Sequence, residues 1–164
     1  MKKSFASSVA FLTMLILASL SACAPTVPTA TVTATDAWMK AVPADAMMTG
    51  AFMTLTNSTD ADITVDRAYS DLAGIVELHE MAMVDGEMIM RKAESPIVIP
   101  AGESFDFAPG GFHFMFMGLE GAIDPGTTVA LTIVLSDGSE VIVDVVAREY
   151  DAANETYVGD GSTD

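Results

Sequence analysis

The chain contains two histidines, and each precedes a methionine at a spacing that would suit a soft-metal site. His79 lies eleven residues before Met90, and His113 lies two residues before Met115. Thioether sulfur is a soft ligand that favours Cu(I), and imidazole also suits copper, whereas zinc rarely takes a thioether. These four side chains are therefore candidate ligands for Cu(I).

The only cysteine of the chain, Cys23, is not a candidate ligand. A blue-copper centre needs a thiolate with two imidazoles, so a domain without further cysteine cannot form one. Two lysines, an apolar stretch over 9–20 and the sequence Leu20-Ser21-Ala22-Cys23 instead resemble a bacterial lipoprotein signal. We expect a signal peptide over residues 1–22 and lipid attachment at Cys23, the alternative being an ordinary signal peptide that contains a cysteine.

The charge of the chain excludes one large class of partners. Loss of residues 1–22 removes two lysines and no acid, which takes the formal charge from −16 to −18 and leaves 142 residues, enough for one domain. Five basic residues against 23 acidic ones argue against nucleic-acid binding, which needs Lys and Arg contacts to phosphate. The acidity attracts cations without selecting among them.

The organisation of the chain predicts one all-β domain behind a short tether. Residues 23–35 are rich in Pro, Thr and Ala and are expected to link a lipid anchor to a domain over 36–149, which a polar tail over 150–164 follows. Asp85-Gly86 and Asp137-Gly138 predict two-residue hairpin turns. Short β-type runs between turn residues predict a Greek-key barrel or sandwich, with strands expected at 51–57, 61–69, 74–81, 87–92, 104–109, 112–118, 127–135 and 140–147.

The first turn predicts how a histidine and a methionine meet. Counting outward from Asp85-Gly86 places His79 and Met90 as diagonal neighbours on one face of a hairpin, with backbones about 7 Å apart. The pairs expected from this register are Val84–Glu87, Met83–Met88, Met81–Met90 and His79–Lys92.

The second half of the candidate site lies in a strand with strict alternation. In the sequence FHFMFM over 112–117, phenylalanines alternate with His113, Met115 and Met117. The phenylalanines are expected to face the core, which leaves the other face for ligands. If this strand lies beside the hairpin, the two together supply a set of two His and two Met. We expect the resulting metal site to be exposed or shallow and to lie near one end of the barrel.

Other readings of the same residues remain open. A methionine on a strand more often fills core than binds metal, and we favour packing or a rim role for Met39, Met47, Met48 and Met53. The sequence leaves open whether Met47, Met48, Met81 or Met117 contribute further ligands. A membrane-tethered β-sandwich that binds a protein partner without metal would explain the anchor equally well. Copper storage or tolerance would use the same ligands, and the sequence suggests no catalytic arrangement for an enzyme.

Two stretches resemble the signature region of periplasmic PCuAC-type copper chaperones. They are VELHEMAMVDGEMIMR and VIPAGESFDFAPGGFHFMFMGL, and AWMKAVPADAMMTGAFMTLTN is similar to the opening of that family, so the resemblance covers roughly 36–147. The family pattern is a His, ten residues, a Met, about twenty-one residues and His-x-Met. Here 22 residues separate Met90 from His113.

The resemblance implies a cupredoxin-like fold that binds Cu(I) through His79, Met90, His113 and Met115. It also implies delivery of copper to the dinuclear centre of a cytochrome oxidase subunit, or to another copper chaperone. Such a protein would be a monomeric, extracytoplasmic lipoprotein at the periplasm or cell surface, held to the membrane by its lipid alone. Some members carry a His- and Met-rich C-terminal tail, which this sequence lacks.

Overall fold

The structure is a computed structural model that describes residues 32–150. None of these residues belongs to a helix that could span a lipid bilayer. The described residues form ten strands and no helix: β1 (Val32–Lys40), β2 (Met48–Asn57), β3 (Ile63–Tyr69), β4 (Ile75–Val84), β5 (Glu87–Lys92), β6 (Ile97–Ile99), β7 (Ser104–Phe107), β8 (His113–Met117), β9 (Thr128–Leu135) and β10 (Glu140–Arg148).

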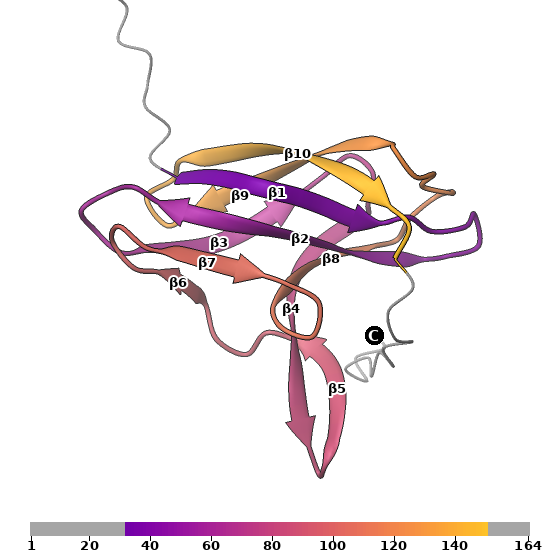
Figure 1. Ribbon diagram of the computed structural model, residues 1–164, viewed down its shortest axis with the longest axis horizontal. Coiled ribbons are helices and arrows are strands. Elements are labelled where there is room, and N and C mark those ends of the chain that lie inside the picture. Colours follow the sequence, from indigo (N-terminus) through magenta and orange to yellow (C-terminus); the bar gives the residue numbers. More distant parts are fainter. Residues whose placement is uncertain (1–31, 151–164) are drawn as a thin grey trace, which may run out of the picture.

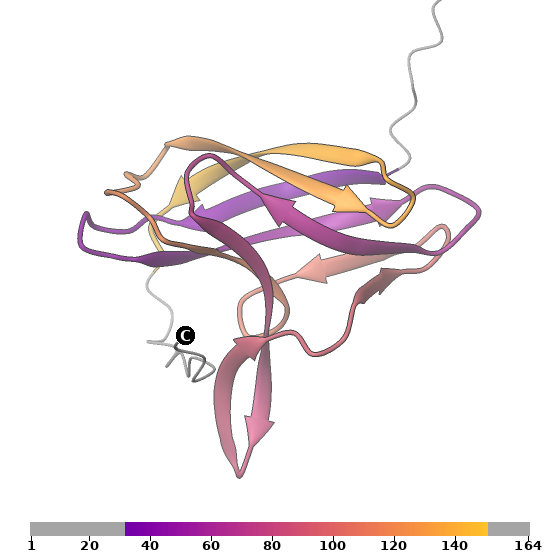
Figure 2. The same ribbon diagram turned by 180° about the vertical axis from the view of Figure 1, so that it is seen from behind.

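The strands build a flattened sandwich from which one hairpin projects. Their order is β5-β4-β8-β2-β1-β10-β9-β3-β6, with β7 on β2, and a bridge between Ala68 of β3 and Val76 of β4 closes the path. Figures 1 and 2 show the two layers of the body and the β4–β5 hairpin extending away from it. The prediction of an all-β, single-domain sandwich is confirmed.

The strand β1 begins inside the segment expected to be a tether. Val32 is 2% exposed, and Thr33, Ala34 and Thr35 pair with Thr56, Leu55 and Thr54 of β2. The boundary at residue 36 is therefore wrong by four residues. Alternating β-branched residues favour a strand, and the sequence showed them beside prolines that indicated a linker. Cys23 lies outside the described residues, and the rest of the domain division stays a prediction.

The two hairpin turns differ from each other. Asp85 and Gly86 have φ angles of 52° and 91°, as the two-residue turn requires, so that prediction is confirmed. The second prediction is wrong, because Leu135 faces Ser139 and three residues lie between them. Gly138 alone has positive φ in that loop, as in a three-residue hairpin with a bulge.

The strand β8 is buried on both of its faces. Phe114 and Phe116 are fully buried in the core, as the alternation predicted, and His113 and Met115 on the opposite face are buried as well. Since β8 lies between β4 and β2, its backbone is paired on both sides. This strand gives the two candidate ligands it carries a rigid position.

Candidate metal centre

The two histidines lie directly opposite each other on neighbouring strands. Residues of β4 pair with β8 so that His79 faces His113, and their ring centroids are 6.0 Å apart at an angle of 56°. The β4–β5 register also agrees with the sequence prediction at every pair, including Met81 with Met90. The histidines are thus brought together as expected, although 33 residues separate them along the chain.

The two candidate methionines approach His79 from opposite directions along the sheet. Met90 on β5 is the diagonal neighbour of His79 towards the hairpin tip, because His79 itself faces Lys92. Met115 on β8 is the diagonal neighbour on the other side, because it faces Glu77. Diagonal neighbours lie about 7 Å apart, within reach of long side chains. His79 is therefore the point around which the other three side chains are arranged.

All four candidate ligands are buried. Their exposed fractions are 0% for His79, 1% for His113, 5% for Met90 and 4% for Met115. The expectation of an exposed or shallow site is therefore wrong. The loop between β7 and β8 contributes to this closure, because the Gly111 carbonyl accepts hydrogen bonds from the Met81 amide and the His113 ring.

The hydrogen bonds of His113 define which nitrogen can bind a metal. Its Nδ1 lies 3.2 Å from the carbonyl oxygen of Gly111, and since a carbonyl can only accept, Nδ1 donates. In the neutral ring Nε2 then carries the lone pair, and this atom is buried with no hydrogen-bond partner. Burial lowers the pKa of His113, only partly offset by the bond to Gly111, and the charge of His79 lowers it further. A soft cation would satisfy this buried acceptor.

The hydrogen bond of His79 selects the other ring nitrogen. Its Nε2 lies 3.1 Å from Oε2 of Glu77, whose Oε1 accepts a hydrogen bond of 2.7 Å from Nζ of Lys92. Burial alone would raise the pKa of Glu77, but the hydrogen bonds and charges of Lys92 and His79 together lower it below its usual range. An ionised carboxylate only accepts, so Nε2 donates and Nδ1 is the nitrogen suited to a metal.

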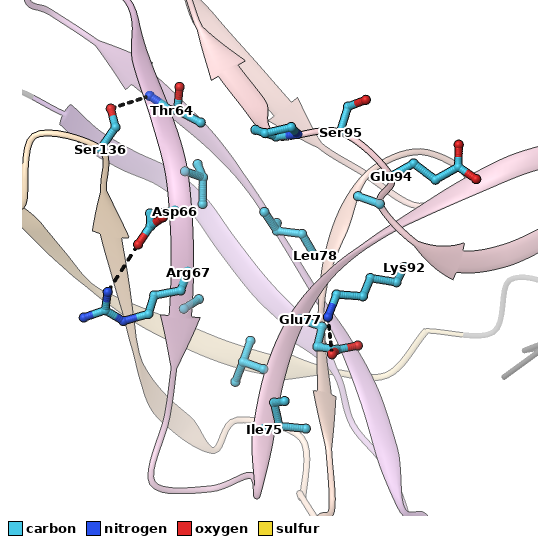
Figure 3. A pocket seen from close by; sticks show the side chains of 15 residues that line it. Thr64, Asp66, Arg67, Ile75, Glu77, Leu78, Lys92, Glu94, Ser95 and Ser136 are labelled. Atoms are coloured by element: carbon cyan, nitrogen blue, oxygen red, sulfur yellow. Dashed lines mark hydrogen bonds and ion pairs between the residues drawn. The ribbon is translucent and has the colours of Figure 1, made fainter. Parts of the chain in front are cut away.

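Glu77 is a functional candidate that sequence reasoning missed. It lies two residues before His79 and therefore on the same face of β4. Figure 3 shows Glu77 and Lys92 pointing towards each other in the wall of a 460 Å³ pocket between β3 and β4. None of the four candidate ligands lines this pocket, but Glu77, which does, is hydrogen-bonded to His79.

Aromatic side chains pack against the side of His113 that faces β2. Trp38, Phe52 and His113 form a row from β1 across β2 to β8, with ring centroids 4.6 and 5.8 Å apart. Gly50 makes room for this row, because a Cβ at that position would lie 3.1 Å from Cζ of Phe52 and 3.6 Å from Cδ2 of His113. The sequence offered no sign of this role.

The remaining methionines have different surroundings. Met39 and Met53 belong to the hydrophobic core, which confirms their assignment to packing. Met47 is 62% exposed, and Met48 faces Met117 in the β2–β8 pairing. Within residues 32–150, no group of three His, Cys, Asp or Glu side chains could hold a metal ion. The candidate centre described above differs from such groups because half of its donors are thioethers.

One protein family matches most of the chain. The family model described as "Putative lipoprotein LpqE-like" matches residues 32–147. The protein named "Putative lipoprotein Lxx21020" from Leifsonia xyli subsp. xyli is 35% identical over 153 residues, which cover 88% of this chain and 91% of that protein.

Solved structures share the fold. The apo PCuAC domain from PmoF1 has a TM-score of 0.61 at 16% identity and covers 73% of this chain and 95% of that domain. Apo-DR1885 from Deinococcus radiodurans has a TM-score of 0.56 at 29% identity, over 92% of this chain and 97% of that one. CuI-DR1885 from the same organism has a TM-score of 0.54 at 26% identity, over 75% and 83% of the two chains. The predicted cupredoxin-like fold of PCuAC domains is confirmed.

Proposed function

Because the chain belongs to the family described as "Putative lipoprotein LpqE-like" and has the fold of PCuAC-type copper chaperones, we propose that it carries Cu(I) between His79, Met90, His113 and Met115. The ion is cargo, held and later released. The protein acts outside the cytoplasm, anchored by a lipid on Cys23, as the lipoprotein name of its relative suggests.

The observation that carries this proposal is the facing pair of imidazoles. His79 and His113 are fixed by backbone pairing, and their hydrogen bonds to Glu77 and Gly111 aim Nδ1 of one ring and Nε2 of the other away from those partners. Ligating histidines typically donate their second nitrogen to a carboxylate or carbonyl in this way. Two imidazoles so oriented, with a buried thioether on each diagonal, form a donor set for one soft ion.

The chemistry of these donors favours Cu(I) among biological metals. Thioethers are soft and uncharged, so they bind Cu(I) without losing a proton and give it up to thiolate or imidazole ligands of an acceptor. One solved relative, at 26% identity, is named as the CuI form of DR1885. We therefore propose that copper leaves this protein by ligand exchange, towards a cytochrome oxidase subunit or another copper chaperone.

Storage of copper is a second candidate, favoured by one observation. All four proposed ligands are at most 5% exposed, and a closed site retains its ion. Transfer rates separate the two functions. Delivery predicts that the Cu(I)-loaded domain metallates an oxidase copper domain faster than copper dissociates into a chelator, whereas storage predicts equal rates set by dissociation alone.

A titration with matched variants tests the site. Met90→Leu and Met115→Leu keep volume and remove sulfur, so each is expected to weaken Cu(I) binding at least tenfold in competition with a Cu(I) chelator. Met53→Leu is the control, because Met53 is equally buried but lies in the core. Unchanged affinity in both site variants, with an unfolding curve like that of the control, would assign those sulfurs to packing alone.

A further inference from the structure

The geometry of the projecting hairpin points to a second Cu(I) site, which we propose is formed by Met81, Met83 and Met88. We call these three side chains the tip thioethers. This inference goes beyond the proposed function, and it rests on that function only for the role of the tip as a relay towards the inner centre.

The hairpin register places the tip thioethers within reach of one ion. Met83 faces Met88 directly, in the second pair from the Asp85-Gly86 turn. In a two-residue hairpin this pair lacks mutual backbone hydrogen bonds, so its Cα atoms lie about 4.5 Å apart and its side chains are close. Met81 follows Met83 on the same face at about 6.6 Å. Flexible thioether side chains can converge across such distances.

The methionines of the hairpin are segregated to one face. Between the turn and His79, every residue on the face of His79 is a methionine: Met81, Met83, Met88 and Met90. The opposite face carries no sulfur, and its residues are Glu80, Ala82, Val84, Glu87, Ile89 and Arg91. Apolar packing does not account for the two methionines nearest the turn, because Met83 and Met88 are 65% and 48% exposed. The segregation therefore indicates a role for the thioethers themselves.

Burial increases along this face from the tip to the inner centre. Met83 and Met88 are 65% and 48% exposed, Met81 is half-buried, and Met90 and His79 are buried. Figures 1 and 2 show that the β4–β5 hairpin stands clear of the sandwich, so its end is open to an approaching ion or protein. The tip thioethers thus lie at the solvent end of a continuous row of donors.

The charge around the tip also suits a cation. Asp85 lies in the turn and Glu87 directly follows it, and both are exposed, in a chain with a formal net charge of −16. Carboxylates raise the local concentration of cations, while the thioethers select the soft ones. This supports capture of Cu(I) at the tip rather than contact with an acidic partner.

The row of methionines gives the buried centre a route to solvent. Successive donors on the same face of a strand are about 6.6 Å apart, so an ion held at the tip can exchange one thioether at a time towards Met90 and His79. Copper remains Cu(I) throughout, and uncharged thioethers release no proton when they bind it. The tip is then a loading and unloading site for the inner centre.

Stoichiometry tests the tip site directly. The double variant Met83→Leu/Met88→Leu keeps apolar volume at exposed positions and removes two of the three sulfurs. We expect the wild-type chain to bind two Cu(I) ions in anaerobic titration against a Cu(I) chelator and the variant to bind one, with loading of that one slowed at least tenfold. The control is Met47→Leu, because Met47 is 62% exposed and immediately precedes the start of β2, about 26 Å along the sheet from the tip.

A second variant separates this proposal from the proposed function. Met90→Leu/Met115→Leu should abolish the inner centre and leave one Cu(I) with sulfur ligands only, as measured by X-ray absorption. If the wild type binds one ion, and the tip variant binds that ion at the same rate, the tip site is wrong while the inner centre stands. The tip site is also wrong if Met83→Leu/Met88→Leu still binds copper while Met90→Leu/Met115→Leu binds none. A tip variant with unchanged stoichiometry and loading but slower transfer to an acceptor would make the tip a docking surface and overturn the proposal.

Discussion

Glu77 and His79 are joined by a hydrogen bond of 3.1 Å between Oε2 and Nε2, and the same carboxylate holds Nζ of Lys92 at 2.7 Å. The bond holds the His79 ring in place and favours the tautomer with the proton on Nε2. Burial alone would raise the pKa of Glu77, but Lys92 and His79 together hold it below its usual range, so the carboxylate stays ionised. A charge pair at the pocket wall therefore sets the chemistry of a buried imidazole.

Replacement Glu77→Gln is expected to weaken Cu(I) binding by about tenfold, within the range found for the partners of metal-binding histidines. The amide can still contact His79, but it no longer carries the charge that favours the required tautomer. Competition with a Cu(I) chelator measures the change. Glu80→Gln is the matched control, since Glu80 bonds Arg91 on the other face of β4, and an equal loss in both variants would exclude an effect through His79.

The metal-free protein is expected to lose stability as the pH falls below about 6.5, the ordinary pKa of histidine. Burial lowers the pKa of His113 in the folded state, so the unfolded chain takes up protons first and the free energy of unfolding decreases with decreasing pH. Urea unfolding at pH 7.5, 6.5 and 5.5 measures this. His113→Gln should flatten the profile, and parallel profiles for the two proteins would show that His113 does not cause the loss.

Gly50→Ala is expected to weaken Cu(I) binding several-fold while changing the free energy of unfolding by less than about 1 kcal/mol. The added methyl group presses on Phe52 and approaches His113, and this crowding is offset by the reduced entropy of the unfolded chain. Gly121→Ala is the control, because no atom lies within 4 Å of a Cβ there. The prediction requires affinity to fall in the first variant and to stay constant in the second.

Asn57→Ala is expected to destabilise the protein by about 2–4 kcal/mol without changing the affinity for Cu(I). The fully buried Asn57 amide donates to the carbonyls of Ala61, Ile99 and Pro100, and its oxygen accepts from the amide and hydroxyl of Thr59. This network lies far along β2 from Gly50. Thermal unfolding measures the loss of stability, and competition with a Cu(I) chelator on the same samples measures the affinity. A loss of affinity at constant stability would contradict the prediction that Asn57 affects stability alone.

The hairpin and β8 could be predicted from sequence because local signals determine them. Asp85-Gly86 permits one turn type, which fixes the β4–β5 register, and alternating phenylalanines fix which face of β8 meets the core. His79 and His113 were expected on compatible faces for these reasons. Their direct opposition required the β4–β8 pairing, which the sequence could only suggest.

The missed features depend on distant contacts. The first four residues of β1 looked like part of a linker because prolines precede them, and one of the two strands that pair with β1, β10, lies more than a hundred residues away. The strand β6 has only three residues. The burial of the centre depends on strand order and on the Gly111 loop, and the roles of Gly50 and Glu77 depend on side-chain geometry. None of these leaves a periodic signal in the sequence.

The parallel pairing of β1 with β10, in which Trp38 faces Val146, joins the first and last strands of the described chain. A chain still emerging from a ribosome or a translocation pore therefore lacks the final piece of its sheet until the end of synthesis. Such distant pairing slows folding, and until it forms the edges of β1 and β9 are open to pairing with other chains. The architecture thus delays completion of the scaffold that carries His79 and His113 until the whole polypeptide has arrived.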